Sequence, residues 1–145
     1  VFEAMRPILE KIAKEIFHLP TPSSATKMKL INNLCLGSFM ATLAECTALA
    51  ESCEIPKAKA LEILGVGGGQ SLVLKAKTQK LIDEDFSAHF SNNAINKDLH
   101  LLQDLAYNLK LPLYSACVPK ELFSKMKMMG KGEEDFSSIY QLFKK

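Results

Sequence analysis

The chain has 145 residues, of which 48% are apolar and 23% charged, and its formal net charge is +2. This length is enough for one domain with a proper buried core. Acidic and basic residues are interleaved, so the sequence lacks the basic footprint that is typical of nucleic-acid binding.

A charged amphipathic helix is predicted over residues 1–17, where apolar residues recur at helical spacing. Because this segment is charged and amphipathic, we expect no signal peptide here. Two prolines and two serines then predict a loop over residues 18–24. The next helix is therefore expected to begin after this loop, with Ser24 or Thr26 as its cap.

That next helix is predicted to run to about Ser52. A stripe of small residues lies along it: Gly37, Ala41, Ala44 and Ala48. Glycine inside a helix costs roughly 1 kcal/mol relative to alanine, so Gly37 is expected to have a packing reason. Polar residues such as Asn33 and Glu45 argue against a lipid-facing span. We predict that this is the central, most buried helix and that the chain does not bind a membrane.

Five further helices are predicted, over residues 56–65, 71–82, 92–109, 113–129 and 134–143. The glycine-rich run at residues 65–69 lacks the Gly-Lys-Ser/Thr ending of a phosphate-binding loop, and no strand precedes it. We interpret it as a turn between helices. Because no stretch alternates with period two, the predicted fold class is all-α, a bundle of about six or seven helices around a long central helix.

The four cysteines are Cys35, Cys46, Cys53 and Cys117, and none forms a Cys-x-x-Cys pair. No histidine stands at metal-ligand spacing from a cysteine, so no metal site is predicted. We interpret the cysteines as small buried apolar residues of a protein in a reducing, cytoplasmic compartment.

Lys29 and Asn33 are the first candidate functional residues. They lie four positions apart, so an amine and an amide project from the same face of a helix. Lys97, on another predicted helix, could converge on them. An amine held by an amide near a second cation can act in proton transfer. The same spacing is commoner on a solvated helix face, so spacing alone leaves both interpretations open.

Four segments of the chain resemble the β-hydroxyacid dehydrogenases, the family of 3-hydroxyisobutyrate dehydrogenase and tartronate semialdehyde reductase. Lys29–Leu34 resembles the Lys-x-x-x-Asn segment of that family, and Lys97–Leu99 its Lys-Asp-Leu segment. Asp85–Phe90 is similar to its Asp-Phe-x-x-x-Phe segment, and Glu134–Ser137 to its closing turn. The segments follow in family order over nearly the whole chain.

The resemblance implies an architecture in which an N-terminal Rossmann domain is joined to an all-α domain like the C-terminal domain of 6-phosphogluconate dehydrogenase. The chain contains no Gly-x-Gly-x-x-Gly fingerprint. Residues 1–20 then correspond to the end of the inter-domain helix and linker, and residues 21–145 to the all-α substrate and dimerisation domain. The Rossmann domain, which would bind most of the NAD or NADP, is absent from this chain, so the chain alone is expected to be inactive.

The resemblance also implies roles for individual residues. Lys29 matches the catalytic lysine, which exchanges a proton with the substrate while hydride moves to or from nicotinamide. Asn33 would orient Lys29 or hold the substrate hydroxyl, and Lys97 would contact the cofactor. Ser23, Asn33 and Phe90 are expected to contact a small hydroxy-acid or semialdehyde substrate.

Two departures leave an alternative open. Ser23 and Ala25 stand where the family usually has glycines, which allow close backbone approach to a cofactor or substrate. Their presence favours a non-catalytic helical interaction module derived from the same fold. The retained Lys29, Asn33 and Lys97 favour the dehydrogenase.

A homodimer is also expected, because family members commonly pair through this domain. Apolar residues are frequent near the C-terminus, and large exposed apolar patches usually mark contact surfaces. The residues expected to contribute are Leu122, Phe123, Met126, Met128, Met129, Phe136, Ile139, Leu142 and Phe143.

Overall fold

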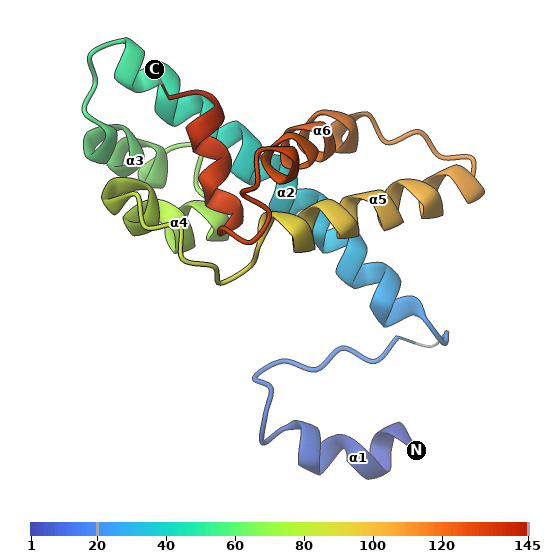
Figure 1. The fold of residues 1–145 in the computed structure, drawn as a ribbon. Coiled ribbons are helices and arrows are strands. Elements are labelled where there is room, and N and C mark those ends of the chain that lie inside the picture. Colours follow the sequence, from blue (N-terminus) through green and yellow to red (C-terminus); the bar gives the residue numbers. More distant parts are fainter. Residues whose placement is uncertain (20, 145) are drawn as a thin grey trace.

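The computed structural model describes residues 1–19 and 21–144, and it is drawn in Figure 1. This part of the chain is all-helical and has no strand, which confirms the predicted fold class. Its elements are α1 (Phe2–Leu9), α2 (Ser24–Ser52), α3 (Lys57–Val66), α4 (Leu72–Asp83), α5 (Asn92–Asn108), α6 (Tyr114–Met128) and the 3-10 helix η1 (Phe136–Leu142).

Helix α2 is the centre of the bundle, as predicted. In Figure 1 it runs diagonally through the molecule, with α3 and α4 toward its C-terminal end and α5 and α6 toward its middle, and it contacts all four and η1. All four residues of the small stripe are buried. A Cβ added at Gly37 would lie only 3.2 Å from Leu99 Cδ1 on α5. Gly37 therefore has the expected packing reason: it lets α5 cross close to α2.

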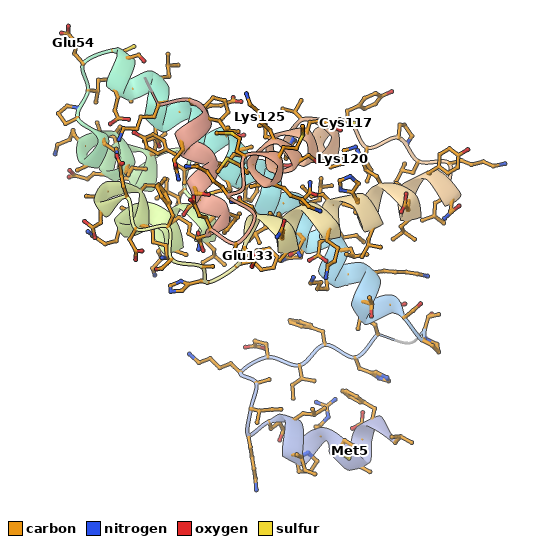
Figure 2. All side chains as sticks on the ribbon, in the orientation of Figure 1. Met5, Glu54, Cys117, Lys120, Lys125 and Glu133 are labelled. Atoms are coloured by element: carbon orange, nitrogen blue, oxygen red, sulfur yellow. The ribbon has the colours of Figure 1, made fainter. Side chains whose placement is uncertain are left out.

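The N-terminal helix is much shorter than predicted. It ends at Leu9, buries no residue, and stands apart from the bundle in Figure 1. Met5 projects from it in Figure 2. A short helix without tertiary contacts is marginal, which explains why the helical pattern over residues 1–17 is not realised in full. The predicted cap was also wrong: Ser23 occupies the cap position of α2, without a side-chain hydrogen bond.

The interpretation of the cysteines as buried was wrong for three of them. Cys35, Cys53 and Cys117 are exposed, Cys46 is half-buried, and all four are free thiols. Cys117 is labelled on α6 in Figure 2.

By length and composition alone, α2 would pass as a membrane-crossing helix, although here it is the central helix of the bundle.

Most of the apolar residues expected to form a C-terminal contact surface belong to the domain's own core. Phe123, Met126, Phe136 and Ile139 are buried. Leu122, Leu142 and Phe143 are partly buried against the same core, and only Met128 and Met129 remain exposed. The reason is that η1 folds back onto α2 and α6, which the sequence pattern did not reveal.

Candidate functional site

The candidate site lies where the first turns of α2 meet α5. Asn33 Nδ2 donates a hydrogen bond to Asp98 Oδ2 at 2.7 Å, and Lys29 Nζ donates to the same oxygen. The Asp98 side chain is only 3% exposed, whereas that of Lys29 is 53% exposed. A buried carboxylate therefore holds an amine at the surface of the domain.

Lys97 lies at the other oxygen of this carboxylate. Its Nζ is 3.8 Å from Asp98 Oδ1, and its side chain is mostly exposed. The structure thus brings Lys29, Asn33 and Lys97 around one carboxylate. Each amine lies next to a different oxygen of Asp98, so the negative charge offsets the repulsion between the two cations. This carboxylate was absent from the arrangement expected from the sequence.

Asp98 was missed although a signal for it exists. On α5 it falls between Ile95 and Leu102, on the same face as the buried Leu99. A carboxylate on an apolar helix face is buried only when it is paired. Its position in the stripe could therefore have predicted that Asp98 meets a cation on a neighbouring helix.

The packing of α5 fixes the position of Asp98. On the α2 side, Gly37 allows the close crossing that brings Lys29 and Asn33 within reach. On the α6 side, the buried Asn96 donates from Nδ2 to Ser124 Oγ at 2.8 Å and to Lys120 O at 3.0 Å. Hydrogen bonds inside the bundle therefore hold α5 in place around its charged residue.

A shallow hollow of about 350 Å³ adjoins Lys97. Its lining includes the basic side chains of Lys97, His100 and Lys127 together with the amides of Asn93 and Asn96. Amines and amides can donate hydrogen bonds to an anionic group. Lys97 therefore borders both the Asp98 carboxylate and a basic hollow with hydrogen-bond donors for an anionic group, while Lys29 approaches that carboxylate from α2.

Two of the segments that resemble the family lie against each other, away from the Asp98 site. They are Asp85–Phe90 and Glu134–Ser137. Asp135 is fully buried, and its carboxylate accepts hydrogen bonds from Lys77 Nζ at 2.8 Å, the His89 amide at 3.0 Å and Ser137 Oγ at 2.7 Å. Burial alone would raise the pKa of Asp135, but the hydrogen bonds from Lys77 and Ser137 outweigh it and hold the pKa below its ordinary 3.8. We call this group the Asp135 cluster, and its role is structural.

Lys80, a second buried lysine, binds the start of the segment Asp85–Phe90. Lys80 Nζ donates to Ser87 O at 2.7 Å and Ser87 Oγ at 3.0 Å. Hydrogen bonds from Ser87 and from Lys80 lower the pKa of Asp85 to about 2. The segment that resembles the family pattern at residues 85–90 is thus kept in place by two lysines of α4.

The two other predicted substrate contacts lie outside the Asp98 group. Phe90 packs edge-on against Phe136, with ring centroids 5.8 Å apart, and against the core. Ser23 is exposed at the start of α2. Within residues 1–19 and 21–144, neither forms a hydrogen bond to Lys29, Asn33 or Asp98. Their substrate role stays a prediction.

Ser23 has a left-handed backbone, with φ of 70°, at a position where the resembled family usually has glycine. Such a conformation costs a non-glycine residue roughly 1–2 kcal/mol, and the Ser23 side chain makes no cap hydrogen bond that could offset it. We expect Ser23→Gly to raise the free energy of unfolding by about 0.5–1 kcal/mol, after the larger chain entropy of unfolded glycine is subtracted. Urea denaturation would measure this free energy, with Ser24→Gly as the control. A Ser23→Gly variant less stable than the parent chain would contradict the prediction.

Comparison with known proteins adds the family context. Residues 23–143 match the family model described as NAD-binding of NADP-dependent 3-hydroxyisobutyrate dehydrogenase. The chain is 33% identical over 99% of its length to 2-(hydroxymethyl)glutarate dehydrogenase of Eubacterium barkeri, of which it covers 48%. It is 30% identical over 99% of its length to cytokine-like nuclear factor N-PAC of Gallus gallus, of which it covers 26%.

The fold is also that of a solved dehydrogenase. The crystal structure of 3-hydroxyisobutyrate dehydrogenase from Salmonella typhimurium superposes with a TM-score of 0.92 at 27% identity. The match covers 97% of this chain and 50% of that one. The chain therefore spans about half the length of the dehydrogenases that it resembles.

Proposed function

The chain belongs to the 3-hydroxyisobutyrate dehydrogenase family, and we propose that it carries the proton-transferring residue of a β-hydroxyacid dehydrogenase. The substrate would be a small 3-hydroxy acid or the corresponding semialdehyde, and the cofactor NAD or NADP. One observation carries the proposal: Asp98, which also accepts a hydrogen bond from Asn33, holds the Lys29 amine at the open surface of the domain.

The proposed chemistry assigns the proton to this chain. A bound nicotinamide cofactor supplies or accepts the hydride. In the reducing direction, Lys29 Nζ donates its proton to the carbonyl oxygen, and in the oxidising direction the amine accepts the hydroxyl proton. Asn33 orients the amine or holds the substrate hydroxyl. Asp98 is a positioning residue, because it accepts a hydrogen bond from Lys29 and fixes Nζ without reaching the substrate.

Lys97 would bind the cofactor in this scheme. Its exposed amine lies beside the Lys29 site and lines the basic hollow described above. Anionic groups of a dinucleotide fit a hollow with several hydrogen-bond donors. The rest of the cofactor site would come from a Rossmann domain, since the chain has no Gly-x-Gly-x-x-Gly sequence.

The proposal extends to the setting of the enzyme. Four free thiols suit a reducing, cytoplasmic compartment. We also propose that the enzyme is a homodimer that pairs through this domain.

The direct test of the proposed activity is an assay of the intact protein for NAD(P)-linked oxidation of 3-hydroxyisobutyrate and 2-(hydroxymethyl)glutarate. Absence of turnover with a series of such acids would count against a dehydrogenase.

The second candidate function is a non-catalytic interaction module. Two observations favour it: Ser23 and Ala25 replace the usual glycines, and one relative bears the name of a nuclear factor. Cofactor binding alone would not separate the two functions, whereas turnover would. An intact protein that binds NAD(P) but oxidises none of the tested acids would favour the module.

The isolated chain is expected to bind NAD and NADP weakly, with a dissociation constant above the micromolar range. The reason is that it lacks the glycine-rich turn and helix N-terminus that hold a pyrophosphate. Calorimetric titration of the 145-residue chain would measure this, with the intact protein as the positive control. Micromolar binding by the chain alone would contradict this prediction and would indicate that the turn at Gly67–Gly69 binds the cofactor.

A further inference from the structure

The connection that leads from α4 into α5, residues 84–91, is bound along its length by the turn between α6 and η1. A row of backbone hydrogen bonds joins the two segments. They run from Asp135 N to Phe86 O at 2.8 Å, from Phe136 N to Phe90 O at 2.9 Å, from Asn92 N to Glu134 O at 2.9 Å and from Asn93 N to Gly132 O at 2.9 Å. In Figure 1, η1 accordingly lies beside α4 and the first turn of α5. The start of α5 is therefore fixed by a part of the chain that is distant in sequence.

Asp135 is the centre of this arrangement, because its two carboxylate oxygens bind different elements. Oδ2 accepts hydrogen bonds from Lys77 Nζ on α4 at 2.8 Å and from the amides of His89 and Phe90 at 3.0 Å and 3.3 Å. Oδ1 accepts from the amide and the hydroxyl of Ser137 on η1, at 3.1 Å and 2.7 Å. One buried side chain thus joins α4, the connection before α5 and η1.

Phe90 is held both at its backbone and at its ring. Its amide donates to Asp135, and its carbonyl accepts from the Phe136 amide. Its ring packs edge-on against the ring of Phe136, with the centroids 5.8 Å apart. Because the next residue, Ser91, is the cap of α5, these contacts fix the point at which the helix begins.

The position of α5 matters because the candidate site is divided between two helices. Lys29 and Asn33 come from α2, whereas Lys97 and Asp98 come from α5. Asp98 lies only about 9 Å along the helix axis from Asn92, so a displaced helix start displaces Asp98 with it. The donor–acceptor distance of an ordinary hydrogen bond varies by only about 0.5 Å. A shift of α5 by about 1 Å along its axis would therefore break the contacts of Asp98 with α2.

We propose that Asp135 is a positioning residue for the dehydrogenase reaction: through residues 89–93 it sets where α5 begins, and so where Asp98 meets Lys29. The inference rests on the proposed function and extends it to a residue outside the Asp98 group. A residue that only stabilises the fold changes the amount of folded protein. A positioning residue also changes the rate of each folded molecule, and a misplacement of about 1 Å can cost about 10²-fold in rate.

The test is Asp135→Asn in the intact protein. The amide keeps the size of the side chain, but it removes the charge that binds Lys77 and replaces one acceptor oxygen with a donor. We expect kcat per folded molecule to fall at least about tenfold, and its pH profile to shift in the same direction as in Asp98→Asn. Ser137→Ala is the matched control, since it removes a hydrogen bond to the same carboxylate on the side of η1 and should leave kcat unchanged. Circular dichroism and urea denaturation give the folded fraction of each variant.

A double-mutant cycle shows whether Asp135 acts through Asp98. In the Asp98→Asn protein, Asp135→Asn should lower kcat by less than about twofold further, because the contact that it positions is already lost. Equal losses in both backgrounds would overturn the inference. A folded Asp135→Asn variant with the kcat of the parent would overturn it as well.

Gly132→Ala reaches the start of α5 without removing a charge, so it decides the matter if Asp135→Asn does not fold. A Cβ at Gly132 would lie only 2.5 Å from Asn93 Oδ1. The Asn93 side chain cannot move away freely, because its Nδ2 donates to Glu133 at 2.7 Å. Glu133 is labelled near the start of α5 in Figure 2. Gly68→Ala is the matched control, since a Cβ there meets no atom within 4 Å.

We expect Gly132→Ala to lower kcat several-fold and Gly68→Ala to leave it unchanged. A folded Gly132→Ala variant with the kcat of the parent would overturn the claim that this turn sets the position of α5. Failure of the proposed function gives a different result, because the parent protein itself would then oxidise none of the tested acids. Normal turnover of the parent, of Asp135→Asn and of Gly132→Ala would retain the dehydrogenase and overturn only the positioning role of Asp135.

Discussion

Lys29→Ala is expected to lower kcat of the proposed dehydrogenase, assayed as the intact protein, by about 10²- to 10⁴-fold, the usual contribution of a general acid or base. The KM for the cofactor should change little, because the proposed scheme assigns proton transfer to Lys29 and cofactor binding to Lys97. The loss should be the same in both reaction directions, since one amine gives and takes the proton. Steady-state kinetics at saturating cofactor would measure it.

Two companion variants and a rescue experiment sharpen this test. Lys125→Ala removes an exposed lysine on α6, labelled in Figure 2, and should leave kcat unchanged. Asp98→Asn keeps the shape of the positioning residue but removes its charge, and should shift the pH profile of kcat. Small primary amines in the buffer should partly rescue Lys29→Ala and leave Asp98→Asn unaffected. An unchanged kcat for Lys29→Ala would show that Lys29 is only a surface lysine and would rule out the proposed mechanism.

Asp135→Ala is expected to lower the free energy of unfolding by about 3–5 kcal/mol, because it leaves the Lys77 ammonium buried without its partner. The Lys77 side chain is 6% exposed and that of Asp135 is fully buried, so water cannot replace the lost contact. The same carboxylate also accepts the backbone amides of His89 and Phe90. Urea denaturation at pH 7 would measure the loss, and Asp104→Ala, at an exposed carboxylate on α5, is the control. A loss below about 1 kcal/mol, the value typical of an exposed pair, would contradict the structural role.

The pH dependence of this contribution has a defined sign. Hydrogen bonds hold the pKa of Asp135 in the folded chain below its ordinary 3.8, despite its burial. The charged form is therefore favoured by folding, and its contribution is fully present above the unfolded pKa of about 3.9. It is lost as the pH falls through the folded pKa. The difference in stability between the parent chain and Asp135→Ala should narrow accordingly below about pH 4.

Much of the fold could be predicted from local sequence. The helix predicted over residues 92–109 is α5, and its buried face carries residues at helical spacing: Ile95, Leu99, Leu102 and Ala106. The helix predicted over residues 71–82 begins at Ser71, whose side chain accepts a hydrogen bond from the Leu74 amide as the cap of α4. The small residues along α2 identified the central helix, and Gly37 its closest crossing. These features are encoded within one or two helical turns, where periodicity, capping and residue size act directly.

The candidate site could be predicted only in part. Lys29, Asn33 and Lys97 were chosen from spacing and resemblance, and the structure brings them together. Asp98, which holds them there, was not chosen, although it stands next to Lys97 in the sequence. Its partners come from a helix 65 and 69 positions away. Which cation meets a buried carboxylate depends on how α2 and α5 cross, and no local pattern contains that.

The sequence by itself therefore determined the helices, the fold class and the candidate amines, because each depends on residues that are neighbours along the chain. The tertiary structure alone decided which groups meet. It placed Asp98 between two lysines, buried Asp135 against Lys77, and moved the C-terminal apolar residues into the core. It also left one side of α2 exposed, at Ile31, Phe39 and Leu49, although α2 was predicted to be the most buried helix. Burial is a property of contacts between distant segments, and a helix that is apolar on two sides does not specify which side its own domain will cover.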